Sequence, residues 1–212
     1  VETFLQTAMS GIDADSPPVE LRRALLALGV HYREKGNFKK ATEEINKAVE
    51  LYKRAEDLTG QCRALTHLAT AYFKQGKFQK AKTRYLKALE LNEQVNDDIV
   101  DWHASGGLAK TLYQLGDLKG SIKFYEAYMK AVDRYSHSYL TDQGRVAILE
   151  DHAAVMNEYV GVTADLAKKT GMARRVTIAA KAAQRRYLWP DRETVLKNFS
   201  RKKVFQSWQS GF

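Results

Sequence analysis

The sequence is poor in several features, and each shortage excludes a class of protein. It holds one cysteine, Cys62, among 212 residues, so no internal disulfide can form and a reducing, cytoplasmic setting is expected. No apolar run approaches the roughly 18 residues that a membrane-spanning helix needs, so we predict no membrane span. No signal-peptide pattern opens the chain, which starts at Val1 rather than Met, as a piece of a longer protein would.

Patterns that carry catalysis or metal binding are missing as well. The five histidines are scattered, with no His-x-x-x-His pair and no Cys/His cluster at metal-ligand spacing. Cys62 and His67 stand five residues apart, which places them on different faces of a helix. Gly106-Gly107 lacks the context of a phosphate-binding loop, and we interpret it as allowing close contact between helices or with a partner. We therefore predict no enzyme, no cofactor and no metal.

Charge is distributed unevenly along the chain. The net charge is +9, yet residues 168–212 alone carry twelve basic and two acidic residues, so the remainder is close to neutral. Such asymmetry favours an acidic partner for the C-terminal end, although a solvated helix face would show the same charges.

Seven positions keep their residue size in three copies that are 40 residues apart, without a gap. The central copy carries Ala69, Tyr72, Gly76, Phe78, Ala81, Tyr85 and Ala88. The preceding copy has Gly29, Tyr32, Gly36, Phe38, Ala41, Ile45 and Ala48, and the following copy has Ala109, Leu112, Gly116, Leu118, Ser121, Tyr125 and Tyr128. The small positions let helices approach closely, and the large ones fill the space between them.

The glycine of each copy is expected to end one helix and open the turn to the next. Gly36, Gly76 and Gly116 each follow a helical pattern, and glycine adopts the left-handed conformation at a helix end without a Cβ penalty. Asn37 and Asp117 suit the N-cap of the next helix, whereas the lysine at the matching position of the second copy does not.

This pattern resembles the tetratricopeptide repeat (TPR), over roughly residues 21–132. The period exceeds the common unit of about 34 residues and is similar to the extended class found in kinesin light chains and spindle-orientation adaptors. The resemblance implies an all-α, right-handed superhelix of antiparallel hairpins that binds proteins and performs no chemistry. The asparagines that those adaptors often carry along the groove are replaced here by Ala27, His67 and Gly107.

The pattern divides the chain into six segments. Residues 1–16 are an N-terminal helix or the remnant of a preceding repeat, and the three clear hairpins are 17–57, 58–97 and 98–136. Residues 137–189 read as a degenerate fourth hairpin, with a lengthened first helix over 141–169 and a turn at Gly171. Residues 190–212 form a basic, aromatic tail or C-terminal capping helix. Terminal repeats are expected to be atypical because they close an exposed apolar face.

In a TPR array the first helix of each hairpin lines a concave groove, so the resemblance implies that a partner peptide or helix binds there. The predicted groove residues are Arg23, Leu26, Arg33, Arg63, Thr66, Thr70, Phe73, Lys74, His103, Lys110 and Tyr113. This mixture of basic and apolar side chains suits a ligand with acidic residues and hydrophobic anchors. Any one of them could instead be an ordinary solvent-facing residue.

The C-terminal segment supplies two further candidate sites. A patch for an acidic partner would comprise Arg174, Arg175, Lys181, Arg185, Arg186, Arg201, Lys202 and Lys203. Phe205, Trp208 and Phe212 share one helical face, either as an anchor inserted into a partner or as the packed face of a capping helix. Nucleic-acid binding through these charges is a less favoured alternative, because the basic residues share a stripe as on a solvated face.

We therefore predict a protein-binding adaptor or scaffold, with a partner segment in the groove and an acidic partner at the C-terminal end. The alternative is a structural component of a cytoskeletal, microtubule or axonemal assembly that docks through its tail. The sequence does not predict the oligomeric state.

Overall fold

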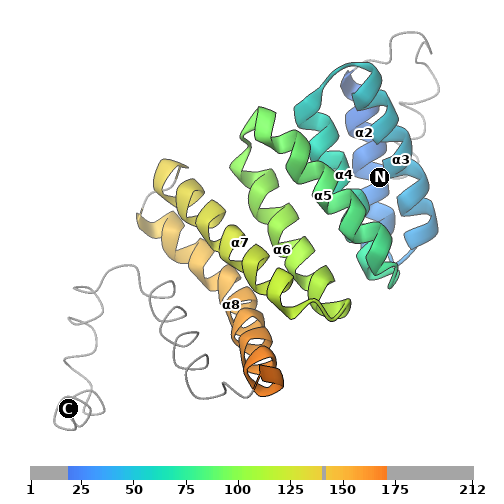
Figure 1. Ribbon diagram of the computed structural model, residues 1–212. Coiled ribbons are helices and arrows are strands. Elements are labelled where there is room, and N and C mark those ends of the chain that lie inside the picture. Colours follow the sequence, from blue (N-terminus) through green and yellow to red (C-terminus); the bar gives the residue numbers. More distant parts are fainter. Residues whose placement is uncertain (1–18, 140–141, 171–212) are drawn as a thin grey trace, which may run out of the picture. The chain divides into compact units, whose positions relative to one another are not determined.

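The computed structural model describes residues 19–139 and 142–170, with the side chains of 137–151, 153 and 154 excepted (Figure 1). The chain divides into two compact units, residues 1–140 and 141–212. The predicted N-terminal helix, the turn at Gly171, the second helix of the fourth hairpin and the tail lie outside the described residues.

Every described element is a helix. In the first unit these are α2 (Val19–Glu34), α3 (Phe38–Arg54), α4 (Leu58–Lys74), α5 (Phe78–Val95), α6 (Asp98–Gln114) and α7 (Leu118–Tyr139), and the second unit contains α8 (Asp142–Thr170). The described residues contain no β-strand, so the all-α prediction is confirmed. The predicted hairpins correspond to the pairs α2–α3, α4–α5 and α6–α7.

The turn within each hairpin is built by the glycine that the repeat places there. Gly36, Gly76 and Gly116 have φ values of 77°, 73° and 80°, in the region that favours glycine. The next residue donates its backbone N–H five positions back, as in Asn37 to the Tyr32 carbonyl at 2.8 Å, which completes a Schellman motif.

N-caps then begin the second helices, as the sequence indicated. The Asn37 Oδ1 accepts from the Lys40 N–H at 3.2 Å, and the Asp117 Oδ1 accepts from the Gly120 N–H at 2.9 Å. Lys77, at the matching position, makes no side-chain cap. The same turn thus leads into a capped second helix in the first and third hairpins and into an uncapped one in the second.

The links between hairpins use a left-handed residue other than glycine. Glu56 and Asn96 have φ values of 52° and 56°, and Asp57 and Asp97 then cap α4 and α6. The second hairpin was expected to start at residue 58, and α4 begins there, at Leu58, because the Asp57 carboxylate accepts from the Gly60 N–H at 2.8 Å.

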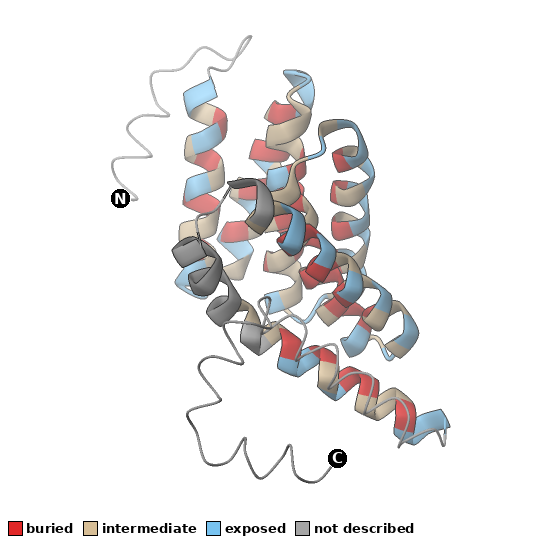
Figure 2. Ribbon diagram, turned by 90° about the vertical axis from the view of Figure 1, so that its left-hand side faces the viewer, coloured by how far each residue is buried: buried red, intermediate tan, exposed pale blue. Residues whose placement is uncertain are grey.

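Small residues at fixed positions bring the helices of a hairpin together. Ala41, Ala81 and Ser121 are 0% exposed, and the Ser121 hydroxyl donates to the Ala109 carbonyl at 2.8 Å, which satisfies its buried oxygen. A Cβ on Gly107 would collide with the Tyr85 ring, so this glycine lets α6 approach α5. Buried residues recur along every helix of the array (Figure 2).

The helices form two rows. Each first helix packs against the second helix of its own hairpin and of the preceding one, and α2, α4 and α6 also contact one another in succession. We call the surface that α2, α4 and α6 present the inner face. The predicted groove residues all belong to these three helices.

The second unit contributes the long helix that the sequence predicted over 141–169. Met156, Tyr159, Val162, Thr163 and Ala167 are buried along it, whereas Val160 is half-buried.

Candidate partner-binding face

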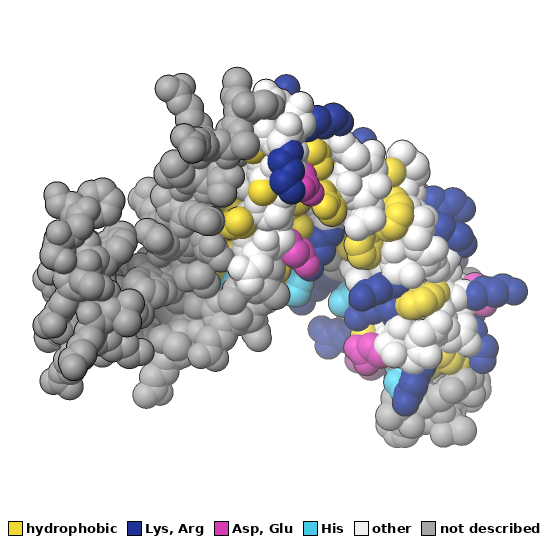
Figure 3. All heavy atoms as spheres, turned by 90° about the horizontal axis from the view of Figure 1, so that it is seen from below, with side chains coloured by type: hydrophobic (Ala, Val, Ile, Leu, Met, Phe, Trp, Pro, Cys, Tyr) yellow, Lys and Arg dark blue, Asp and Glu magenta, His cyan; other side chains and the backbone are white. Residues whose placement is uncertain are grey.

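The inner face presents most of the predicted groove residues to solvent. Arg23, Arg63, Lys74, His103 and Tyr113 are exposed, and Leu26, Arg33, Thr70, Phe73 and Lys110 are half-buried. On the face drawn in Figure 3, Lys, Arg and His side chains lie close to hydrophobic patches. Three successive hairpins thus contribute both charged and apolar groups to one surface.

Thr66 is the exception. It is only 7% exposed, and its hydroxyl donates to the Cys62 carbonyl of its own helix at 2.9 Å. Because it offers almost no surface and its donor is occupied, Thr66 supports α4 and drops out of the proposed contact set. The register put it on the inner side of α4, but the sequence could not show how closely the neighbouring helices cover it.

Thr70 is also occupied, by a contact between α4 and α5. Its hydroxyl donates to the Thr66 carbonyl at 2.9 Å and lies 2.9 Å from the Tyr85 hydroxyl, which therefore donates to it. Burial raises the pKa of Tyr85 to about 12, so its hydroxyl stays neutral.

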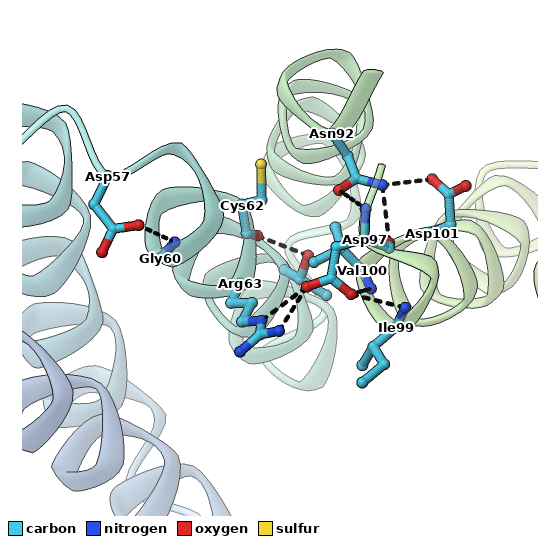
Figure 4. Close-up of polar contacts among 10 residues, drawn as sticks. Asp57, Gly60, Cys62, Arg63, Asn92, Asp97, Ile99, Val100 and Asp101 are labelled. Atoms are coloured by element: carbon cyan, nitrogen blue, oxygen red, sulfur yellow. Dashed lines mark hydrogen bonds and ion pairs between the residues drawn. The ribbon is translucent and has the colours of Figure 1, made fainter. Parts of the chain in front are cut away.

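Arg63 is held by an ion pair with the loop between α5 and α6. Its Nη2 and Nε lie 2.6 Å and 3.0 Å from the Asp97 Oδ2, while the other Asp97 oxygen accepts from the Ile99 N–H at 2.9 Å (Figure 4). The Asn92 side chain donates to the Asp97 carbonyl and accepts from its N–H. One carboxylate thus caps α6 and fixes a groove residue, a double role that the sequence prediction missed.

Arg33 of α2 and His67 of α4 meet on the inner face, and His103 of α6 lies near enough to act on the pKa of His67. The Arg33 Nη1 lies 3.3 Å from the His67 Nδ1. Burial lowers the pKa of His67 from 6.5 to about 4, with further lowering by Arg33 and His103. Part of the His103 ring is exposed, and partial desolvation and Arg33 lower its pKa, which Asp97 opposes.

Sequence reasoning included Arg33 and His103 but passed over His67. The available signal was its register, because His67 stands where related adaptors carry a groove asparagine. That signal places His67 on the inner face but does not say that Arg33 reaches it.

Aromatic residues lie toward the C-terminal ends of the inner helices. The Phe73 ring centroid is 5.5 Å from that of Phe78, and Tyr113 remains 39% exposed. Lys74 follows Phe73 directly in the sequence, and Lys110 lies one helical turn before Tyr113. This end of the face therefore combines apolar anchor surface with positive charge.

Among the described residues, no group of three His, Cys, Asp or Glu side chains could hold a metal ion. Burial raises the pKa of the Cys62 thiol to about 11, which leaves it protonated in the core. None of the described helices combines the length and apolarity that crossing a membrane requires. The predicted patch Arg174, Arg175, Lys181, Arg185, Arg186, Arg201, Lys202 and Lys203, and the predicted anchor Phe205, Trp208 and Phe212, lie outside the described residues.

Comparison with known proteins agrees with this architecture. The model of the family described as tetratricopeptide repeat matches residues 20–94 and 61–134, more than half of the chain. The chain belongs to the tetratricopeptide repeat family. The TPR pattern read from the spaced glycines and alanines is thereby confirmed.

Several solved structures resemble this TPR protein. The apo form of RapI is 14% identical with a TM-score of 0.58, over 97% of this chain and 77% of that one. BtubC (BKLC) from P. vanneervenii is 15% identical with a TM-score of 0.53, over 88% and 86%. A Podosopora anserina putative kinesin light chain is 12% identical with a TM-score of 0.48, over 90% and 96%. At such identities the likeness shows the fold alone. Among curated protein sequences, none matches this chain.

Proposed function

We propose that this TPR protein is an interaction adaptor, which holds a segment of a partner protein on the inner face of α2, α4 and α6. The observation that carries the proposal is the contact between Arg33 and His67 of two successive hairpins, with His103 of the third hairpin near enough to lower the pKa of His67. A surface assembled from several repeats can follow an extended or helical ligand along its length.

The chemistry of the face indicates what such a segment would contain. Exposed or half-buried cationic groups lie on all three inner helices, and Phe73 and Tyr113 supply apolar surface at one end. Aromatic and arginine side chains contribute disproportionately to binding energy in protein interfaces. The expected ligand is therefore acidic with one or two apolar anchors.

A second contact, between an acidic partner and the C-terminal end, is supported only by charge. Residues 168–212 carry twelve basic residues against two acidic ones.

The cytoplasm is the compartment that the single, buried cysteine suits best.

Site-specific photo-crosslinking in cells tests the proposal. A photoreactive aromatic residue replaces Tyr113 on the inner face or, as the matched control, Leu86 on α5; the two are 39% and 42% exposed. We expect a partner to be captured from position 113 and not from position 86, with capture lost when Arg33→Gln is added. Equal capture from both positions, or capture from Leu86 alone, would contradict the assignment of the inner face.

A further inference from the structure

The contact between Arg33 and His67 determines where the proton of the imidazole lies. A guanidinium has only donors, so the Arg33 Nη1 must donate across the 3.3 Å to the His67 Nδ1. The Nδ1 therefore carries a lone pair, and the ring is neutral with its proton on Nε2. Protonation of Nδ1 would replace this hydrogen bond with two donors facing each other.

Few negative charges oppose this cluster. The Arg33 side chain is 18% exposed, and the carboxylate nearest to it among the described residues, that of Glu34, lies 3.8 Å away on a 66% exposed side chain. The charges that act on His67 are Arg33 from α2 and His103 from α6, and both lower its pKa. On the α5 side the neighbouring titratable group is the Tyr85 hydroxyl, which is neutral. Asp97, at the start of α6, acts on His103, but its charge is already paired with Arg63.

We propose that Arg33, His67 and His103 form one carboxylate-binding cluster, which takes up a proton from solvent when an acidic side chain of a partner segment binds. The inference rests on the proposed adaptor function and adds its ligand chemistry and its regulation. A carboxylate between Arg33 and His67 would accept from the guanidinium, and it would accept from Nδ1 only if that nitrogen gained a proton. A tautomer shift from Nε2 would supply that proton without net uptake, but the negative charge of the bound carboxylate favours the doubly protonated, cationic ring and therefore uptake from solvent. Arg33 and a protonated His67, which would repel each other in the free protein, would then share one anion.

The occupant follows from charge complementarity. Three cationic or protonatable groups from three repeats favour an acidic ligand and disfavour a basic one. The chain's own C-terminal segment carries twelve basic and two acidic residues, the same sign as the cluster. An acidic segment of another protein is therefore the occupant that the structure favours.

Proton uptake has a measurable consequence for affinity. If binding raises the pKa of His67 by about two units from its present value of about 4, affinity for the acidic segment tightens about fourfold between pH 7.5 and pH 5.5. A basic face without a protonatable group would bind equally well at both values, apart from the titration of the ligand itself.

The experiment uses the full chain and a synthetic peptide of alternating glutamate and leucine residues, with a glutamine–leucine peptide as control. Calorimetry at pH 7.5 and 5.5, in buffers with different ionisation enthalpies, gives the affinity and the number of protons taken up. Histidine NMR follows the titration of His67 and His103 with and without peptide. The variants are Arg33→Gln, His67→Gln and His103→Gln, with Arg54→Gln on the outer α3 as the matched charge control.

The inference is supported by proton uptake with the glutamate peptide, by a rise of at least one unit in the His67 midpoint, and by loss of both in His67→Gln. Arg33→Gln should weaken binding at least tenfold, and Arg54→Gln should leave it unchanged. Binding without proton uptake at pH 5.5, no binding at 1 mM peptide, or binding only of a phosphoserine version of the peptide would overturn it. If one of these results were obtained while a partner was still crosslinked from position 113, the adaptor function would stand and only the proton-linked cluster would be refuted.

Discussion

At the scale of single residues, His67 should make stability depend on pH. Its pKa is about 4 in the folded protein against 6.5 ordinarily, because it is buried beside Arg33 and His103. Between these values the unfolded chain binds a proton that the folded chain does not, so stability is complete above about pH 6.5 and declines as the pH falls toward 4. The loss approaches about 3 kcal/mol. Urea titrations across this pH range give the free energy of unfolding of wild type and of His67→Gln. That of the wild type should fall more steeply as the pH is lowered, and an equal pH dependence in the two proteins would contradict the assignment.

Gly107 is a second residue whose role can be tested. A Cβ there would collide with the Tyr85 ring, which is 2% exposed and holds the hydrogen bond to Thr70. We expect Gly107→Ala to destabilise by about 1–3 kcal/mol, despite the better helix propensity of alanine. Gly161→Ala is the matched control, because Gly161 is exposed and has no atom within 4 Å of its virtual Cβ; it should be neutral or stabilising. Chemical denaturation of both variants measures the contrast, and equal stabilities would show that Tyr85 moves aside at no cost.

At the scale of elements, the links between helices differ in how well their residue suits the left-handed conformation. Glu56 adopts φ 52° at the end of α3, which costs a residue with a Cβ about 1–2 kcal/mol that glycine avoids. Glu56→Gly should therefore stabilise the protein by about 0.5–1 kcal/mol. Gly76→Ala, at φ 73° with nothing near its virtual Cβ, should destabilise by a similar amount through the backbone alone. Thermal unfolding of the two variants should shift in opposite directions, and a shift in the same direction would refute this account.

Asp97 combines a cap and an ion pair, and the two can be separated. Asp97→Asn keeps an oxygen for the Ile99 N–H and loses the charge that holds Arg63, so we expect a loss below about 1 kcal/mol. Asp97→Ala loses the cap as well and should cost about 1–2 kcal/mol more. Urea unfolding of both variants measures the difference. If the two were equally destabilised, the ion pair rather than the cap would be the main contribution.

The same elements show what the sequence could and could not predict. The hairpins, their turns and two of the caps were predictable because a left-handed glycine and a capping asparagine or aspartate act locally. The contacts on the inner face were not, because Arg33 meets His67 and Arg63 meets Asp97 across 34 residues, not the 40 of the repeat. In these pairs, positions equivalent in sequence do not face each other, so the repeat period alone does not predict which side chains meet. Nor could the sequence show that neighbouring helices leave only 7% of Thr66 exposed.

At the scale of the whole array, stability should be graded from the middle outwards. In the first unit each hairpin packs only on its neighbours, and α4 and α5 have a hairpin on both sides. Repeat arrays built in this way derive their stability from the hairpins and from the interfaces between adjacent ones. The central hairpin participates in two such interfaces, whereas α2 and α3 participate in one among the described residues.

Amide hydrogen exchange under native conditions should reveal this gradient. We expect the slowest exchange in α4 and α5, and faster exchange in α2 and α3, because the outer hairpin can open while the central interface persists. Glu56→Gly, which stabilises the link between α3 and α4, should slow exchange in α3 more than in α5. Uniform protection across α2–α7 would mean that the array opens only as a single cooperative unit. In that case a ligand on the inner face would stabilise all three hairpins equally, rather than the ones it contacts.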